Sequence, residues 1–320
     1  MMIDPKHIHG WGLNVVVNGK TSRLMLDTGA SGLLLSRKAA ERAGITYVSD
    51  MKFSGFGDKG PQGGHVAFAE SIKIGDLEFR NCAIGITEQA RVLDDDGLIG
   101  ADVFSHYLVD IDFPDHQLKL TPLPKRPEDI AIAPATLQTE GTDSADAEKA
   151  AAPDVAKTDA KDHGPIAPPH KDSGPQDRYV APEMKSYTSI FRFGHQLLIS
   201  TRVNGGPAGL FLIDTGSTNS LISPEAAREV TKVHQTDRVQ VKGLSGKVQQ
   251  LYTADKAVLQ FARFKQENLD LISFDLSKMS RSTGVEVSGV LGYSVLGFLD
   301  IKIDYRDGLV DFSYDPSHWR

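Results

Sequence analysis

The chain repeats itself, and this constrains its fold more than any other feature of the sequence. Residues 24–36 read LMLDTGASGLLLS and residues 211–223 read FLIDTGSTNSLIS, so an Asp-Thr-Gly triplet follows three apolar residues in both places. The short segments GLIG at 97–100 and GVLG at 289–292 match each other in the same order. This internal duplication predicts two related folding units of similar size.

Each copy has the pattern of an all-β unit with little helix. Asn18-Gly19 and Asn204-Gly205 lie between apolar runs, and Asn-Gly in this setting is a strong signal for a β-hairpin. Later in each copy, apolar and polar residues alternate with a period of two, at 109–113 and at 301–305. We therefore expect two lobes that are built from short strands.

Residues 125–186, between the copies, differ from both of them. The segment is rich in proline, alanine and acidic residues, and it has no aromatic residue from Lys125 to Arg178. Such a composition buries too little apolar surface to offset the entropy that is lost on ordering. We predict a flexible, disordered linker between a first lobe at 1–124 and a second lobe at 187–320. A loosely packed helical insertion is the alternative for the linker.

Composition narrows the functional classes. The formal net charge of −7 argues against a nucleic-acid-binding protein, because phosphate binding needs an excess of positive charge. The single cysteine, Cys82, excludes an internal disulfide framework and a multi-cysteine zinc site, and it is expected to be a small core residue. No apolar run approaches the roughly 18 residues that span a bilayer, so no membrane partner is expected. Residues 1–10 lack the apolar stretch of a secretory signal, which makes a cytoplasmic location the default expectation.

The two Asp-Thr-Gly triplets carry the chemical information. Asp27 and Asp214 each follow a predicted buried strand, which places a carboxylate at the edge of a core. A single triplet is explained equally well by a tight turn in which the aspartate caps nearby amides. A matched pair points instead to two carboxylates that lie close together and share one proton, because both cannot ionise cheaply. Such a pair supplies a general base and a general acid at one site, without a metal or a cofactor.

Both copies resemble the aspartic peptidases, and in particular their retropepsin-like branch. The family pattern is two apolar residues, Asp-Thr-Gly and then Ala or Ser, followed later by two apolar residues and Gly. Here Asp27 is matched with Ile99-Gly100 and Asp214 with Leu291-Gly292, so the resemblance covers nearly the whole chain outside the linker. It implies an all-β fold of two retropepsin-like acid-protease lobes that form an intramolecular pseudo-dimer. A monomer with paired lobes is expected, with a domain-exchanged dimer as the alternative.

The resemblance also implies roles for the residues around each aspartate. Thr28 and Thr215 would brace the two loops through hydrogen bonds to the backbone of the opposite lobe. Gly29 and Gly216 would offer their amides to the carboxylates. Ser217 would place a hydroxyl beside its carboxylate, whereas the first copy has alanine at that position. The two aspartates are therefore not expected to be electrostatically equivalent.

The family closes a glycine-bearing β-hairpin, called the flap, over its substrate. Candidate flaps lie at 53–66 in the first copy and at 239–252 in the second, and mobile surface loops explain both segments equally well. The flap candidates are Gly55, Gly57, Gly243 and Gly246. The first segment contains no tyrosine, so the flap tyrosine of pepsin-like enzymes is not evident.

The implied function is that of an aspartic endopeptidase. The Asp27 and Asp214 pair would activate a water molecule to hydrolyse peptide bonds of a polypeptide substrate. Two other classes stay open. One is a non-catalytic module that binds peptides or proteins on the same scaffold. The other is an actin-like or sugar-kinase-type ATPase, whose phosphate loops read Asp-x-Gly followed by two Ser or Thr residues, a pattern that 213–220 resembles.

Overall fold

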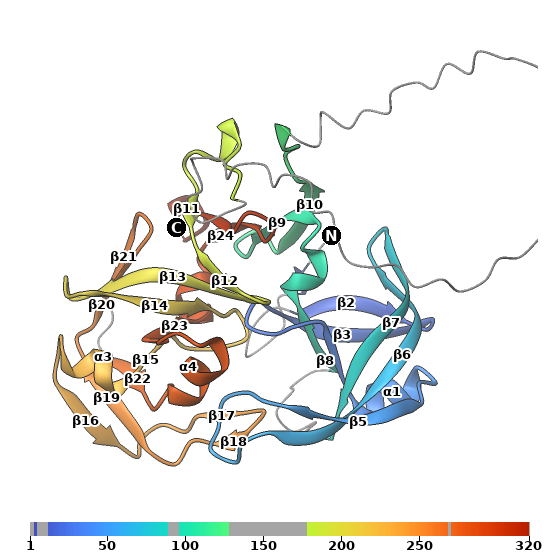
Figure 1. Ribbon diagram of the computed structural model, residues 1–320, viewed down its shortest axis with the longest axis horizontal. Coiled ribbons are helices and arrows are strands. Elements are labelled where there is room, and N and C mark those ends of the chain that lie inside the picture. The colour runs from blue at the N-terminus through green and yellow to red at the C-terminus, as the bar shows by residue number, and fades with distance from the viewer. Residues whose placement is uncertain (1–2, 5–11, 89–95, 128–177, 268–269, 320) are drawn as a thin grey trace, which may run out of the picture.

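The computed structural model describes residues 3–4, 12–88, 96–127, 178–267 and 270–319. They form two β-rich lobes that lie side by side, the first in blue and teal and the second in yellow and orange in Figure 1. A five-stranded sheet takes strands from both lobes and lies above them in this view. The expectation of an all-β fold with two lobes is confirmed.

The first lobe is an eight-stranded sheet. Its strands are β1 (Ile3–Asp4), β2 (Gly12–Val17), β3 (Lys20–Asp27), β4 (Leu33–Ser36), β5 (Tyr47–Phe53), β6 (Gln62–Ile74), β7 (Leu77–Thr87) and β8 (Gly97–Gly100). They are paired in the order β1-β2-β3-β8-β4-β7-β6-β5. The helix α1 (Arg37–Arg42) follows β4, and the 3₁₀ helix η1 (Ala101–Phe104) follows β8.

The second lobe is a ten-stranded sheet. Its strands are β12 (Phe191–Phe193), β13 (Gln196–Val203), β14 (Ala208–Ile213), β15 (Leu221–Ile222), β16 (Val233–Thr236), β19 (Leu251–Asp255), β20 (Val258–Phe261), β21 (Phe264–Glu267), β22 (Asp270–Ser273) and β23 (Gly289–Leu291). They are paired in the order β16-β19-β22-β15-β23-β14-β13-β20-β21, and β12 pairs with β13. A separate small hairpin is formed by β17 (Lys242–Gly243) and β18 (Gly246–Lys247). The helices of this lobe are α3 (Pro224–Arg228), α4 (Ser277–Thr283) and α5 (Tyr293–Leu296).

The duplicated segments fold alike because they carry the same local signals. In each copy the strand after the Asp-Thr-Gly loop ends in a serine that caps a short helix. The Ser36 hydroxyl accepts the amide of Ala39 at 3.2 Å, and the Ser223 hydroxyl accepts the amide of Ala226 at 3.1 Å. These caps satisfy amides that a helix start would otherwise leave without partners, so the two serines fix where α1 and α3 begin.

The five-stranded sheet joins the lobes. Its strands are β9 (Tyr107–Asp112), β10 (Gln117–Pro122), β11 (Thr188–Ser189), β24 (Asp300–Asp304) and β25 (Leu309–Ser313), in the order β10-β9-β24-β25-β11. β9 of the first copy pairs antiparallel with β24 of the second, with Ile111 opposite Ile301. The apolar residues of the predicted alternation, including Val109 and Ile303, are buried in one core that extends through both lobes. The lobes therefore share a core and a sheet as well as a chain.

Residues on both sides of the segment 128–177 are anchored at one point of the second lobe. Asp307 lies in the turn between β24 and β25, and its side chain is fully buried. Its Oδ1 accepts a hydrogen bond from the Arg126 guanidinium and a second one, at 3.0 Å, from the amide of Tyr179. The chain is therefore held at the same carboxylate before 128–177 and after it.

The structure corrects the C-terminal boundary of the predicted linker. Ala181 and Met184 are buried and pack on Leu309, within residues that the sequence assigned to a flexible segment. They pack because these few apolar side chains cover the end of the shared sheet, a contact that composition averaged over 125–186 does not indicate. The middle of that segment, 128–177, lies outside the described residues.

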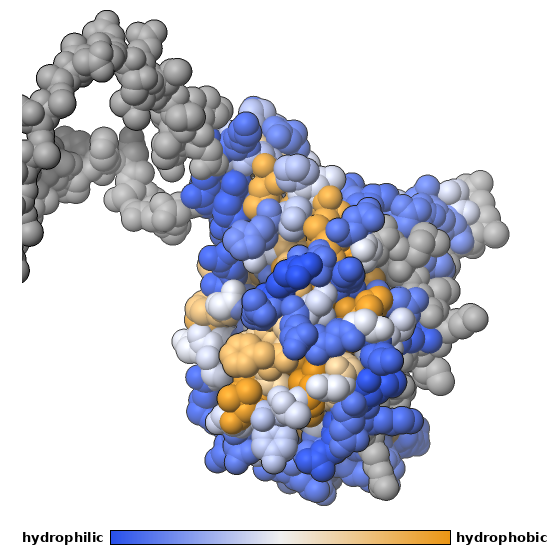
Figure 2. Space-filling model, turned by 90° about the vertical axis from the view of Figure 1, so that its right-hand side faces the viewer, coloured by the Kyte–Doolittle hydropathy of each residue, from blue (hydrophilic) through white to orange (hydrophobic). Residues whose placement is uncertain are grey.

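Figure 2 shows the side of the molecule that the first lobe forms, where apolar side chains gather among polar ones. The large apolar residues that are most exposed on β5 and β6 are Tyr47, Val48 and Phe68. Among the helices of the described residues, none is both long enough and apolar enough to cross a membrane.

Candidate active site

Both Asp-Thr-Gly triplets lie where a buried strand leaves the core. β3 ends at Asp27 and runs parallel to β8, which places Asp27 opposite Gly100. In the second lobe β14 runs parallel to β23, and the amide of Asp214 donates to the carbonyl of Leu291 at 3.0 Å. On their other edges β8 and β23 pair with the returning strands β4 and β15. Each aspartate is thus fixed on a loop between paired strands.

Asp27 and Asp214 meet at the junction of the two lobes. Their carboxyl groups are hydrogen-bonded to each other, and the two residues are only 9% and 6% exposed. The loops approach so closely that a Cβ atom on Gly29 would lie 2.6 Å from Cγ of Asp214. One on Gly216 would lie 2.5 Å from Cγ of Asp27. Glycine is needed at both positions because any side chain would occupy the space of the opposite carboxyl group.

Amides of each loop hold its own carboxyl group. The amide of Gly29 donates to Oδ1 of Asp27 at 2.8 Å. Oδ1 of Asp214 accepts from the amides of Gly216 and Ser217, at 2.9 and 3.1 Å. These bonds fix the orientation of each carboxyl group.

Two threonines brace the loops across the junction. The Thr28 hydroxyl donates to the carbonyl of Ile213, and the Thr215 hydroxyl donates to the carbonyl of Leu26, both at 2.8 Å. Each hydroxyl also accepts the amide of the other threonine at 3.0 Å. All four residues are buried, so these bonds form a closed network that sets the spacing of the two aspartates.

Burial raises the pKa of both carboxyl groups, because it disfavours the charged form. The pKa of Asp214 is raised well above its usual range, first by burial and then by the charge and hydrogen bond of Asp27. The pKa of Asp27 is raised by burial and is lowered in part by its hydrogen bonds to Asp214, Gly29 and Ala30. The two carboxyl groups therefore titrate as a unit, and burial favours a state in which the pair shares one proton.

The hydroxyl of Ser217 differs from the expectation. It donates to the carbonyl of Asn219 at 2.9 Å, so Ser217 supports Asp214 through its amide while its hydroxyl stabilises the loop. Serine hydroxyls commonly form such hydrogen bonds with backbone groups close by in the sequence. The sequence placed the residue beside the correct carboxyl group but assigned the contact to the wrong atom.

The two flap candidates are hairpin tips, and they contact each other. The first is the tip between β5 and β6, and the second is the tip between β17 and β18. The amide of Gly55 donates to the Ser245 hydroxyl at 3.1 Å, and the amide of Ser245 donates to the carbonyl of Phe56 at 2.9 Å. A Cβ atom on Gly57 would lie 2.4 Å from the Ser245 carbonyl oxygen, and one on Gly243 would lie 2.6 Å from the carbonyl oxygen of Phe56. The glycines that the sequence singled out thus let the two tips pack backbone against backbone.

Each tip also inserts an apolar side chain into the opposite lobe. Phe56 of the first flap joins a core cluster of the second lobe, with its ring edge-on to Phe274 at 5.7 Å between centroids. Leu244 of the second flap, flanked by Gly243 and Gly246, packs on a first-lobe cluster around Leu34. The two hairpin tips are therefore bonded to each other and packed on the opposite lobes, and their role as flaps over a substrate stays a prediction.

Sequence reasoning missed four residues of the site. Phe56 and Leu244 carried a readable signal, since each is an apolar residue between glycines at the centre of a candidate flap. Lys278 in α4 donates to the carbonyls of Gly57 and Asp58, both at 3.2 Å, and only the tertiary structure brings it to the first flap. The fourth is Asp102 in η1, which accepts hydrogen bonds from the loop of the first aspartate.

Other side chains that could hold a ligand are few in the described part of the chain. There, no three His, Cys, Asp or Glu side chains gather in a way that could bind a metal ion. Cys82, expected in the core, is half-buried on β7 and packs against the main core. The buried carboxyl pair is therefore the chemical feature from which a function is to be argued.

Comparisons with known proteins give a family match and similar solved structures. A family model described as aspartyl protease matches residues 13–103 and, a second time, residues 199–295. A solved retropepsin-like aspartic protease from Rickettsia conorii is similar over 38% of this chain and 88% of its own, with 22% identity and a TM-score of 0.30. A solved aspartic proteinase from Irpex lacteus is similar over 96% of this chain and 94% of its own, with 14% identity and a TM-score of 0.44.

Two curated proteins match parts of the sequence. The UBA domain-containing protein Mud1 of Schizosaccharomyces pombe is 31% identical over 111 residues, which are 34% of this chain and 32% of that protein. DNA damage-inducible protein 1 of Chaetomium globosum is 26% identical over 170 residues, which are 52% of this chain and 36% of that protein. The matched part thus spans about a third of the length of these relatives. Because the family model matches twice, over more than half of the sequence and with one Asp-Thr-Gly triplet in each match, the chain belongs to the aspartyl protease family.

Proposed function

We propose that the protein is an aspartic endopeptidase in which Asp27 and Asp214 form one catalytic pair. The observation that carries the proposal is the hydrogen bond between these two buried carboxyl groups at the junction of the lobes. Two buried carboxyl groups this close to each other cannot both ionise cheaply, so the pair keeps one shared proton. The charged group can then act as a base and the protonated group as an acid. Neither lobe can supply this chemistry alone, since each contributes one aspartate.

Asp27 acts as the general base and Asp214 as the general acid. As the oxygen of a bound water bonds to the scissile carbonyl carbon, Asp27 takes a proton from the water and Asp214 gives its proton to the carbonyl oxygen. This yields a neutral tetrahedral diol. When the C–N bond breaks, the proton on Asp27 passes to the leaving nitrogen, and one hydroxyl of the diol returns a proton to Asp214. The pair ends in its starting state, and no bond to the enzyme forms.

The surrounding residues keep the pair in the geometry that this cycle needs. The Thr28 and Thr215 network fixes the distance between the two loops, and the Gly29 and Gly216 amides fix the orientation of each carboxyl group. Such groups need no rearrangement during the reaction, which lowers its barrier.

We propose an extended polypeptide as the substrate. The joined flaps cross between the lobes, and a chain held under them would lie along the junction where the two aspartates meet. An extended backbone offers hydrogen-bonding groups along its length, and hairpin flaps have exposed backbone groups that match them. The family membership supports a polypeptide over other substrates.

Cleavage of a peptide library between pH 4 and 7, with and without pepstatin, tests the proposal. Asp27→Asn and Asp214→Asn should each lower kcat by about a thousandfold or more while the fold is retained, because either change removes the shared proton. Asp76→Asn, in the exposed turn between β6 and β7, is the matched control and should keep full activity. Full activity in either dyad variant would exclude the shared-proton mechanism.

The same experiment decides between the proposal and the other functional classes. A parent protein that binds peptides but cleaves none would be the non-catalytic module. The actin-like ATPase is disfavoured because that fold fills the interval between its phosphate loops with alternating strands and helices. Stabilisation of the protein against heat by ATP would favour the ATPase again.

A further inference from the structure

A third carboxylate, Asp102, supports the loop of the first catalytic aspartate. It lies in η1, directly after β8, the strand that runs beside Asp27. Its Oδ1 accepts the amide of Gly32 at 3.0 Å, and its Oδ2 accepts the Ser31 hydroxyl at 2.9 Å. Both oxygens are thus bonded to the loop that begins at Asp27.

The backbone around Asp102 is shaped to let this carboxylate reach the loop. The amide of Gly100 donates to the carbonyl of Gly32 at 2.7 Å, so the loop is bonded to β8 and to η1 at the same place. A Cβ atom on Gly100 would lie 2.4 Å from Oδ1 of Asp102 and 2.5 Å from the carbonyl oxygen of Ala30. The glycine leaves room for the carboxylate to lie directly against the loop.

The second lobe lacks this carboxylate. At the position that corresponds to Asp102 in the duplication it has Ser294, whose hydroxyl accepts the amide of Ser220 at 3.0 Å. There the loop is held by backbone bonds instead, from the amides of Tyr293 and Ser294 to the carbonyls of Ser217 and Thr218. One loop therefore has a charged support and the other a neutral one.

The charge of Asp102 reaches the region of the dyad. Tyr305 of the second lobe is buried, and burial raises its pKa well above the usual range. The charges of Asp102 and Asp27 raise the pKa of Tyr305 further, so both carboxylates act on the same buried side chain.

We propose that Asp102 is a positioning residue that orients Asp27 through Ser31 and Gly32 and tunes the protonation of Asp27 by its charge. The inference rests on the proposed function. A negative charge near Asp27 favours the protonated form of that carboxyl group. Removing the charge should therefore let Asp27 ionise at lower pH, and loosening the loop should slow the chemical step.

Asp102→Asn tests the inference, with Ser294→Ala as the matched control in the other lobe. Asp102→Asn should lower kcat about tenfold with KM within about twofold of the parent, because the loop loses its fixed geometry. The acid limb of the pH profile should move down by about half a unit, the size expected for one screened charge nearby. Ser294→Ala should change kcat less than about threefold and leave the acid limb in place.

A second variant and a second measurement keep the test independent of folding and of activity. Asp102→Ser places the neutral residue of the second lobe in the first and should reproduce the shift of the acid limb if Asp102→Asn does not fold. NMR titration of the Asp27 carboxyl carbon should show the same downward shift in either variant without any substrate. An unchanged titration, or equal effects of Asp102→Asn and Ser294→Ala, would overturn the inference. A parent that cleaves no peptide would overturn the proposed function, while the titration would still decide the role of Asp102.

Discussion

The two lobes match in the Asp-Thr-Gly loops that bond across the junction and differ at several corresponding positions around these loops. Both supply Asp-Thr-Gly, both threonines bond across the junction, and both glycines are packed against the opposite carboxyl group. The corresponding pairs Asp102 and Ser294, Asp110 and Lys302, and Tyr305 and Phe113 are not alike.

The differences give the first lobe the more charged surroundings. The Tyr305 hydroxyl is buried and has no hydrogen-bond partner among the described residues. Its counterpart Phe113 packs edge-on against Tyr293 of the second lobe, at 5.4 Å between ring centroids. Both lobes thus have a buried aromatic ring at this position, but only one of these rings carries a hydroxyl group.

The largest effect is expected from locking the two flaps together. They differ in length but meet at their tips, and a Cβ atom on Gly55 would lie 3.0 Å from Cβ of Leu244. We expect Gly55→Cys with Leu244→Cys, in a Cys82→Ser background, to form a disulfide on oxidation, because the two Cβ atoms are close enough with a small adjustment. The oxidised protein should lose peptidase activity, since substrate can no longer pass between the tips, and a reductant should restore it.

Peptide cleavage before and after reduction measures this effect, with each single cysteine variant as a control. Full activity of the oxidised double variant would mean that substrate enters without separation of the flaps. If oxidation lowered the activity of only one of the two single variants, its cysteine would be reacting with a group other than the opposite flap.

A smaller effect is expected from the charges at the junction, where the lobes differ at Asp110 and Lys302. These residues lie opposite each other in the pairing of β9 with β24. The pKa of Asp110 is raised from 3.8 to about 7, first by burial and then by the hydrogen bond and charge of Asp300. Lys302 and Lys119 oppose this shift in part. Burial raises the pKa of Tyr187, and the charges of Asp110 and Asp300 add to this rise.

The sign of the pH dependence follows from this shift. The folded protein binds a proton at Asp110 between pH 4 and 7 that the unfolded chain does not bind, so stability falls as pH rises through this window. Asp110→Asn should reduce the fall in Tm between pH 5 and 8, because the amide stays neutral. Asp112→Asn, on the same strand and the same face, is the control and should behave like the parent. Equal pH dependence in all three proteins would show that Asp110 does not titrate in this range.

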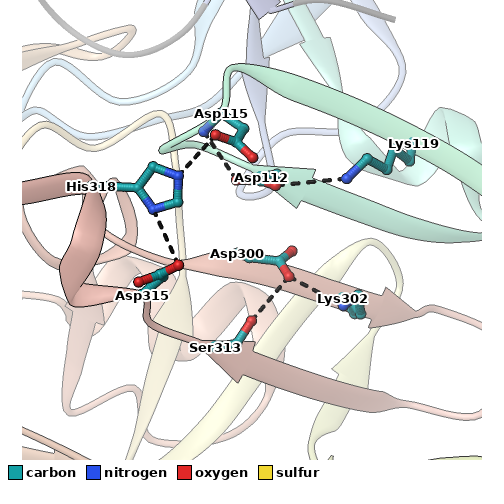
Figure 3. A network of polar contacts seen from close by, with 8 residues as sticks. All are labelled: Asp112, Asp115, Lys119, Asp300, Lys302, Ser313, Asp315 and His318. Carbon is teal, nitrogen blue, oxygen red and sulfur yellow. Dashed lines mark hydrogen bonds and ion pairs between the residues drawn. The ribbon is translucent and has the colours of Figure 1, made fainter.

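A second group at the same junction acts in the same direction. Figure 3 shows His318 between Asp115 and Asp315, at 2.9 and 3.8 Å, beside the network of Asp300 and Lys302. The hydrogen bond of Asp115 raises the pKa of His318, so the stabilisation by this ion pair is present at low pH and is lost as pH rises through the folded-state value. The Asp110→Asn variant should therefore keep part of the fall in Tm between pH 5 and 8. Adding His318→Gln to this variant should make the fall in Tm smaller still.

The smallest effect is expected from exchanging the residue types at the corresponding positions Tyr305 and Phe113. Tyr305→Phe should raise the free energy of unfolding by about 1 kcal/mol, because it removes a buried hydroxyl without a partner. Phe113→Tyr should lower it by a similar amount. Denaturant unfolding measures both, and kcat should stay within about twofold of the parent. Destabilisation by Tyr305→Phe would mean that the hydroxyl makes a favourable contact in solution.

The sequence predicted well what is local or repeated. The period-two alternation at 109–113 and 301–305 gave the buried faces of β9 and β24, because strand geometry alternates side chains without help from distant residues. The composition of 125–186 as a whole predicted a disordered segment. It did not indicate that Ala181 and Met184 pack on Leu309.

The duplication by itself determined that the chain has two β-lobes and two aspartates in equivalent positions. Only the tertiary structure decided how the copies differ in use: which tip residue enters which lobe, and that Asp102 supports one loop alone. The reason is physical. Strand periodicity and turns depend on neighbours in sequence. Desolvation, shared protons and packing depend on groups that are up to 221 positions apart in the chain and meet only when the lobes close on each other.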